Sequence, residues 1–217
     1  MTERPSDSGE TEVTDASWPV DLTGVTESVV TTLGPNGLWN VAVLGLFAED
    51  PSGGCSPRNY STLVRARTWG NTRTKRNFHR QGCGYVQFTR DPVDFVDGAL
   101  SITEREDPLL ESADAWVRVQ ATPEGTGTEG GTEWEDWTLE PLESAVRNRT
   151  VTPINRGFGA VIEATVVASR LDVEGYDRAE LEGRLERCLD VVNRAGGPRE
   201  QEAFANLCRY SGWFPRR

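Results

Sequence analysis

Lysine and histidine are almost absent from this sequence. Lys75 is the only lysine, so 22 of the 23 basic residues are arginine, and His79 is the only histidine. Asp and Glu number 34, which gives a formal net charge of -11 at pH 7. An acidic chain with arginine in place of lysine is typical of salt-in halophiles, whose dense carboxylates are screened by molar salt. A GC-rich genome is the alternative explanation for the arginines, although it does not account for the excess of acid.

The scarcity of histidine and clustered cysteine excludes several kinds of site. Cys55, Cys83, Cys188 and Cys208 lie far apart without a C-x-x-C pair, so we expect reduced thiols and no metal. A Ser-His-Asp site would have to use His79, and no G-x-S-x-G motif accompanies it. A nucleic-acid-binding role is disfavoured as well, because such proteins are usually basic.

Long hydrophobic runs are also missing. The longest is Val41–Ala48, well short of the roughly 20 residues that span a bilayer, and the first residues have no apolar stretch of the kind found in signal peptides. We therefore expect a cytoplasmic protein with no membrane partner. The hydrophobic fraction of 36%, together with 22 glycines, is compatible with a packed core in a chain of 217 residues.

The hydrophobic pattern divides the chain into three parts. Residues 1–18 hold five acids and one arginine with almost nothing apolar, and are expected to form a disordered acidic tail. Residues 19–171 are rich in β-branched residues and turn signals, which predicts a mainly β domain, a small barrel with one short helix in the middle. Residues 172–217 change to a helical period, which predicts a C-terminal helical hairpin packed on the barrel.

Within the barrel we expect a hairpin, a short helix and several further strands. The hairpin joins Val25–Leu33 to Leu38–Phe47 through the turn Gly34–Gly37. The helix is expected over Asn71–Arg80, with Asn71 or Thr72 as its N-cap. The other predicted strands are Thr62–Trp69, Tyr85–Thr89, Ala115–Thr122, Glu133–Pro141 and, as a long strand, Ala160–Leu171. Pro123–Gly131 is expected to be a loop, and the acid-rich segment Ala121–Glu140 a solvated hairpin or insertion.

The most unusual window is Pro51–Arg90, which contains eight basic residues and no acidic one. A local cationic region on an acidic protein favours a phosphorylated ligand. Arg65 and Arg67 lie on the same face of the expected strand, and a helix begins directly after it, so hydroxyls and free backbone amides would meet an anion there. The alternative is that these arginines pair with carboxylates elsewhere in the protein.

Four segments carry a resemblance to a known family: Gly37–Gly45, Arg67–Thr72, Gly84–Phe95 and Asn155–Leu171. In this order they resemble the archaeal DUF447 family, which is related to the flavin-reductase-like split β-barrels. The resemblance covers the chain from about Val25 to Trp213. It implies an FMN-binding split barrel that acts as a homodimer, with the flavin at the subunit interface.

The resemblance also implies which residues would hold the cofactor, leaving catalytic residues unknown. Asn40, Val41 and Ala42 match the strand along the isoalloxazine ring, and Trp69 matches a position that is often aromatic. The strand-to-helix corner that holds ribityl and phosphate groups matches Arg67, Thr68, Asn71 and Thr72. Gln87 on the next strand, and Asn155 with Arg156 in a late loop, complete the candidate set.

Five of these residues also have a structural explanation. Asn40 could bond the preceding turn, Thr72 could be only a helix cap, and Gln87 could be an exposed strand residue. Trp69 could belong to the core, and Arg156 could pair with Glu163.

The leading hypothesis is therefore an FMN-dependent oxidoreductase of an unknown small-molecule substrate, since the cofactor supplies the chemistry without a recognisable catalytic dyad. A non-catalytic flavin-binding sensor or carrier is the alternative, and an RNA-binding face on Pro51–Arg90 is a third.

Overall fold

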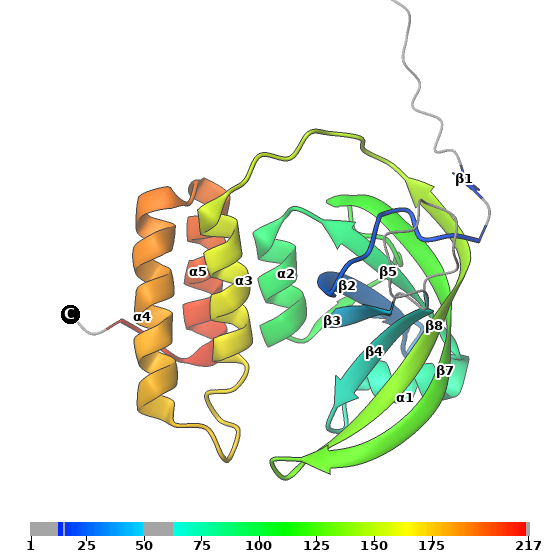
Figure 1. The fold of residues 1–217 in the computed structure, drawn as a ribbon, viewed down its shortest axis with the longest axis horizontal. Helices are drawn as coiled ribbons and strands as arrows, with labels where there is room; N and C mark the ends of the chain where they lie inside the picture. The colour runs from blue at the N-terminus through cyan, green and yellow to red at the C-terminus, as the bar shows by residue number, and fades with distance from the viewer. Residues whose placement is uncertain (1–12, 15, 50–62, 216–217) are drawn as a thin grey trace, which may run out of the picture.

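The computed structural model describes residues 13–14, 16–49 and 63–215. Six strands close into an antiparallel barrel in the order β8-β4-β3-β2-β5-β7, with β7 pairing back to β8 (Figure 1). They are β2 (Val25–Leu33), β3 (Trp39–Glu49), β4 (Leu63–Trp69), β5 (Cys83–Thr89), β7 (Ala113–Glu129) and β8 (Thr132–Val146). Two short strands lie beside this ring: β1 (Val13–Thr14) pairs with β8, and β6 (Thr103–Arg105) pairs with β3. The predicted barrel is confirmed, whereas the predicted tail over residues 1–18 falls largely outside the described residues.

The β7–β8 hairpin is longer than the sequence suggested. The segment Pro123–Gly131, expected to be a loop, continues β7 as far as Glu129, and the turn is made by Gly130 and Gly131, whose φ angles are 56° and 81°. Two adjacent residues with positive φ give the tight turn that suits a twisted hairpin. Inward residues of the acid-rich segment, such as Trp137 and Leu139, are buried in the barrel core. This hairpin is therefore part of the barrel wall rather than a solvated insertion.

The short helix predicted over Asn71–Arg80 is observed as α1 (Arg73–Gln81), and it covers one end of the barrel (Figure 1). Thr72 is its N-cap and Gly82, in the left-handed conformation, ends it. The Phe78 side chain is buried among barrel residues, with its ring centroid 5.1 Å from that of Trp137.

A layer of four helices packs beside the barrel (Figure 1). It consists of α2 (Pro92–Leu100), α3 (Arg156–Ala168), α4 (Arg178–Ala195) and α5 (Pro198–Ser211). The predicted helices after Asp177 and Arg199 correspond to α4 and α5. None of the helices in the described ranges is long and apolar enough to cross a membrane.

The long strand predicted over Ala160–Leu171 is wrong, because these residues belong mainly to α3 and the turn after it. The β-branched residues favoured a strand, but Val161, Ala164, Thr165 and Ala168 are all buried, and their spacing is that of one helical face. The closed ring of strands offers no free edge for another strand of this length. The domain limit after Leu171 stays a prediction. It assigns α3 to the barrel domain, although α3 packs with the helical layer.

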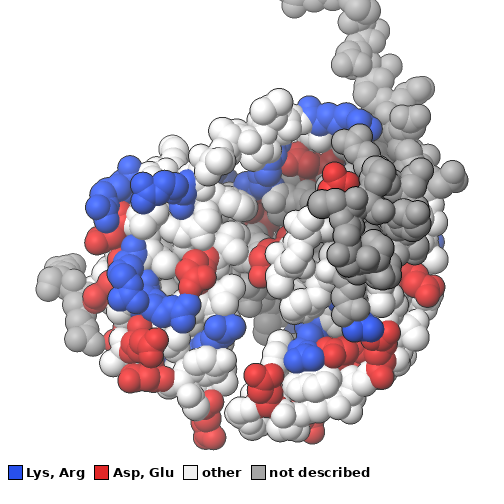
Figure 2. Space-filling model, viewed as in Figure 1, with Lys and Arg blue, Asp and Glu red and all other residues white. Residues whose placement is uncertain are grey.

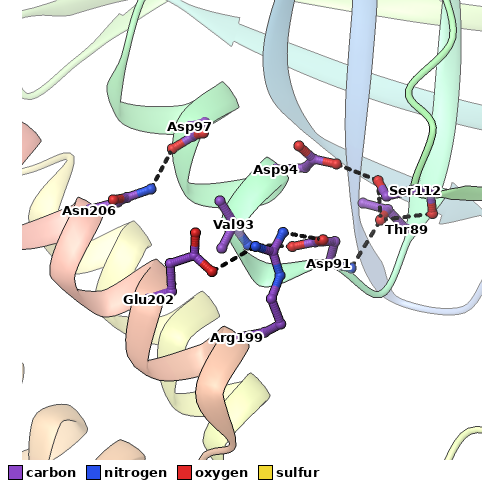
Figure 3. Close-up of polar contacts among 9 residues, drawn as sticks. All are labelled: Thr89, Asp91, Val93, Asp94, Asp97, Ser112, Arg199, Glu202 and Asn206. Carbon is purple, nitrogen blue, oxygen red and sulfur yellow. Dashed lines mark hydrogen bonds and ion pairs between the residues drawn. The ribbon is translucent and has the colours of Figure 1, made fainter.

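Polar contacts hold α2 between the barrel and α5 (Figure 3). On the α5 side, Arg199 Nη2 lies 2.5 Å from Asp91 Oδ2, and Asn206 Nδ2 donates to Asp97 Oδ1 at 3.2 Å. On the barrel side, Ser112 donates to Asp94. Polar contacts from α5 on one side and from Ser112 on the other therefore fix the position of α2.

Candidate functional site

An interrupted strand edge defines the candidate site. β2 pairs with one edge of β3 along residues 25–33 and 39–47. The opposite edge of β3 pairs with β6 at residues 39–41 and with β4 at residues 46–49. Within the described ranges, Ala42–Gly45 therefore have no strand partner on that edge, and β4 diverges from β3 after Ala66. Alternate residues of this stretch direct their backbone groups to β2, and the Leu44 carbonyl also accepts a hydrogen bond from Ser28 Oγ at 2.7 Å. The backbone groups directed to the other edge lack a strand partner and can bond to a ligand.

A pocket of about 280 Å³ lies at this divergence. One side is formed by β3, the end of β4 and the start of α1, and the other by α2 and α3. Its lining residues are Ala42, Val43, Leu44, Arg67, Thr68, Trp69, Thr72, Thr74, Phe95, Gly98, Ala99, Thr165, Val166 and Ser169. The pocket thus combines an apolar wall with hydroxyl groups and one guanidinium.

Five of the predicted site residues line this pocket: Ala42, Arg67, Thr68, Trp69 and Thr72. Trp69 is 44% exposed, so it is not a core residue. Val41 is buried next to them in a small cluster with Phe95, and Asn40 is also buried. The side-chain oxygen of Asn71, just before the helix cap, accepts a hydrogen bond from Arg76 at 3.0 Å.

The start of α1 is the part of the pocket best suited to an anion. Thr72 Oγ1 accepts a hydrogen bond from Lys75 N at 3.2 Å, and Thr74 is buried against the pocket. The first turn of α1 contains no acidic residue. Because a helix N-terminus carries partial positive charge and free amides, this corner favours a phosphate or carboxylate. Thr72 therefore caps the helix and also lines the pocket.

Arg67 reaches the pocket with its guanidinium already paired. Its Nε and Nη2 atoms donate to the Asp136 carboxylate at 2.6 and 2.9 Å, and these hydrogen bonds raise the pKa of the guanidinium. The Cζ atom lies 3.9 Å from the ring centroid of Trp134 and 5.5 Å from that of Trp69. The Asp136 carboxylate and the two tryptophan rings thus hold the Arg67 side chain at the pocket wall.

The expected cationic region of Pro51–Arg90 is largely neutralised in the described part of that window. Carboxylates pair with Arg65, Arg67, Arg73, Lys75 and Arg90. Four of these five acids come from β7 and β8, and in the β4–β8 ladder Asp136 lies directly opposite Arg67. The face in Figure 2 accordingly shows blue and red side chains interspersed. The structure therefore agrees with the alternative that these basic residues pair with carboxylates elsewhere in the protein. Arg58 lies outside the described residues.

Three predicted site residues lie away from the pocket. Gln87 is fully buried, where its amide donates to Thr31 Oγ1 and Pro108 O and accepts from Leu110 N, so it is neither exposed nor available to a ligand. Asn155 caps α3 and donates to Glu200 Oε1 at 2.8 Å. Arg156 begins α3, about 14 Å along the helix from Thr165 at 1.5 Å per residue. Glu163, the alternative partner considered for Arg156, forms an ion pair with Arg184.

The sequence reasoning missed the helical wall of the pocket. Phe95, Gly98 and Ala99 come from α2, and Thr165, Val166 and Ser169 from α3 and its end. The sequence signal for this wall is the pair of small residues Gly98 and Ala99, which lets α2 lie close to β3. A Cβ on Gly98 would lie 3.4 Å from Val41 Cγ1 and 3.6 Å from Ala42 C. No group of three potential metal ligands occurs among the described residues.

Comparison with known proteins places the chain in a family. Residues 26–148 match the N-terminal domain of a protein of unknown function, DUF447, and residues 155–209 match a second DUF447 domain. The chain belongs to the DUF447 family. A search of curated proteins gave no match.

Among solved structures, an FMN-bound DUF447 protein from Methanosarcina mazei is 21% identical, with a TM-score of 0.68 over 86% of this chain and 95% of the other. A nitrilotriacetate monooxygenase component B from Bacillus cereus is 13% identical, with a TM-score of 0.41 over 60% of this chain and 74% of the other. Flavoredoxin from Methanosarcina acetivorans is 8% identical, with a TM-score of 0.42 over 63% and 79%. The Methanosarcina mazei structure shows that the split barrel with its helical layer is the fold of this chain.

Proposed function

We propose that this DUF447 protein binds FMN in the pocket between β3, β4, α1 and the helical layer, and that it acts as a flavin-dependent oxidoreductase. The observation that carries the proposal is the open edge of Ala42–Gly45 facing a pocket that ends at the start of α1. The Methanosarcina mazei protein of the same family is FMN-bound.

The residues of the pocket fit the three chemical parts of FMN. The flat ring system needs an apolar wall and hydrogen-bonding groups along one edge, which Val43, Leu44 and the open backbone of β3 offer. The ribityl hydroxyls match the hydroxyl groups of the lining threonines. The phosphate matches the first turn of α1, where Thr72 and Thr74 lie.

When bound, FMN supplies the hydride or electron transfer, and the protein supplies position and electrostatics. Phe95 and Val166 would exclude water from one side of the pocket, and Trp69 would cover its rim.

The proposal includes a homodimer with FMN near the subunit interface. The family resemblance supports it, together with the exposed apolar residues Val151 and Ile154, which are 95% and 99% exposed in the segment between barrel and helices. Sedimentation analysis of the protein with bound FMN tests this point. An FMN-bound monomer at micromolar concentration would contradict it.

A matched pair of substitutions at Thr72 tests the phosphate position. Asn and Asp both cap helices well, so Thr72→Asn and Thr72→Asp should fold alike. Only the aspartate repels a phosphate, so Thr72→Asp should lose FMN affinity by about tenfold or more while riboflavin affinity stays equal in the two variants. Quenching of flavin fluorescence measures both affinities, and Arg156→Ala is the control away from the pocket. A wild-type protein that binds neither flavin would refute the proposal.

Reduction of the bound flavin separates an enzyme from a carrier. An oxidoreductase should bleach the flavin absorbance on addition of NADH or NADPH and consume the nucleotide steadily in air. Bleaching without steady consumption would indicate the non-catalytic carrier or sensor. The RNA-binding alternative loses its main support, because the described basic residues of Pro51–Arg90 are mostly paired with carboxylates.

The charge pattern adds a proposal about environment. With a net charge of -11 and a single lysine, the protein should be adapted to high salt. Its thermal midpoint should therefore rise between about 0.1 M and about 3 M KCl, where charge repulsion is screened within a few ångströms. A midpoint that falls or stays constant would favour the GC-rich genome instead.

A further inference from the structure

The only lysine and the only histidine of the chain contact the same carboxylate oxygen. Lys75 Nζ lies 3.3 Å from Glu135 Oε2, and His79 Nε2 lies 2.9 Å from the same atom. Lys75 and His79 are four residues apart on α1, so they project from one side of that helix. The Glu135 side chain is only 6% exposed, whereas that of His79 is 49% exposed. A buried carboxylate, a lysine and an accessible imidazole thus form one cluster between α1 and β8.

This cluster adjoins the anion corner of the pocket. Glu135 is the register partner of Thr68, and Thr68 Oγ1 donates to the Glu135 carbonyl at 3.4 Å. Lys75 directly follows Thr74 and donates its backbone amide to Thr72. Thr68, Thr72 and Thr74 all line the pocket. Glu135 is therefore next to a pocket residue by strand register, and Lys75 by sequence.

The other charged groups near the cluster have different partners. Arg76 donates to the carbonyl and side chain of Asn71, and Arg80 to Leu33 O and the Asn77 side chain. The Arg67–Asp136 pair comes from the neighbouring positions of β4 and β8, whose side chains project to the opposite face of the sheet from Thr68 and Glu135. The remaining contact of His79 is the uncharged ring of Trp137, 5.0 Å between centroids.

We propose that Lys75 and Glu135 are specificity-determining residues that set the preference of the pocket for a phosphorylated ligand over the same ligand without phosphate. This inference rests on the proposed FMN site. Lys75 and Glu135 together carry no net charge, so the loss of either charge leaves the other uncompensated. Because the Glu135 side chain is 6% exposed and that of Lys75 19% exposed, such an uncompensated charge acts on an anion at the start of α1.

Two substitutions should shift the preference in opposite directions. Lys75→Gln leaves the Glu135 charge uncompensated and should lower the ratio of FMN to riboflavin affinity by about three- to thirtyfold, as for one partly screened unit charge. Glu135→Gln leaves the lysine charge uncompensated and should raise the same ratio by a similar factor. Lys75→Arg keeps the charge and should keep the ratio near that of the wild type. A purely structural anchor for α1 would not give changes of opposite sign.

The measurement is a fluorescence titration with FMN and with riboflavin, and circular dichroism shows whether each variant is folded. Equal ratios in the wild type and in Lys75→Gln would overturn the inference, even if Glu135→Gln failed to fold. Failure of the proposed function looks different, because then the wild type binds neither flavin.

Discussion

Arg67 on β4 and Asp136 on β8 lie opposite each other in the barrel, and the guanidinium donates two hydrogen bonds to the carboxylate at 2.6 and 2.9 Å. This two-point geometry is the one by which arginine also binds phosphate. Asp136 therefore competes with any anion for the arginine that lines the pocket.

Substitution of each partner should change FMN affinity in opposite directions. Asp136→Asn frees the Arg67 fork and should tighten FMN binding by about tenfold, whereas Arg67→Ala should weaken it by about as much, which corresponds to about 1.4 kcal/mol. Glu124→Gln, which removes the partner of Arg65 outside the pocket lining, is the control. Fluorescence titration measures the affinities. Equal affinity in the two variants would show that Arg67 serves only the barrel wall.

Gly98 should set how closely α2 approaches the open edge of β3. A Cβ at this position would make ordinary contacts with Val41 and Ala42, so Gly98→Ala should fold normally and gain up to about 1 kcal/mol from helix propensity. Gly98→Leu adds atoms between α2 and β3 at the pocket and should lower FMN affinity strongly. Titration with FMN and chemical denaturation compare the two variants. Unchanged affinity in Gly98→Leu would place the ligand elsewhere.

The sequence predicted the barrel because its hairpins are local. The turn signals at Gly34–Gly37 and the β-branched run of Val25–Leu33 act over short distances, and the structure confirms this hairpin nearly residue by residue. The strand-to-helix corner at Arg67–Thr72 was found for the same reason, since strand, cap and helix follow one another in the sequence.

The missing parts of the site depend on long-range packing. Thr165 and Ser169 line the pocket from α3 and its end. This position depends on the barrel being closed by other strands, so it cannot be predicted from the local sequence of α3. The pairing of Arg67 with Asp136 joins residues 69 positions apart, and a charge count cannot reveal such a partner. Gln87 looked available because its burial depends on Pro108 and Leu110, which belong to a distant turn.

The helical layer offers a prediction with a control in the same helix. A Cβ on Gly157 would collide with the backbone of Gly196, including its nitrogen at 2.7 Å, whereas a Cβ on Gly159 would meet nothing within 4 Å. Gly157→Ala should therefore destabilise the protein by about 1–3 kcal/mol or more through overpacking. Gly159→Ala should be neutral or stabilising by up to about 1 kcal/mol. Urea denaturation measures both, and equal stabilities would contradict the close packing of α3 on the α4–α5 connection.

The pair of Arg90 and Asp114 should contribute a small, acid-sensitive part of the stability. Hydrogen bonds from Arg90 lower the pKa of the Asp114 carboxyl below its ordinary value of 3.8. A carboxyl whose pKa is lowered by folding stabilises the protein above its unfolded pKa, and this contribution is lost as the pH falls through the folded pKa. Because Arg90 is about half exposed, with a side-chain exposure of 48%, we expect no more than about 1 kcal/mol. Between about pH 5 and pH 2, the free energy of unfolding from urea denaturation should therefore fall less steeply in Asp114→Asn and in Arg90→Gln than in the wild type.

The double variant should show no further change in slope, since both substitutions remove the same interaction. Identical slopes in all four proteins would mean that the pair does not stabilise the folded state.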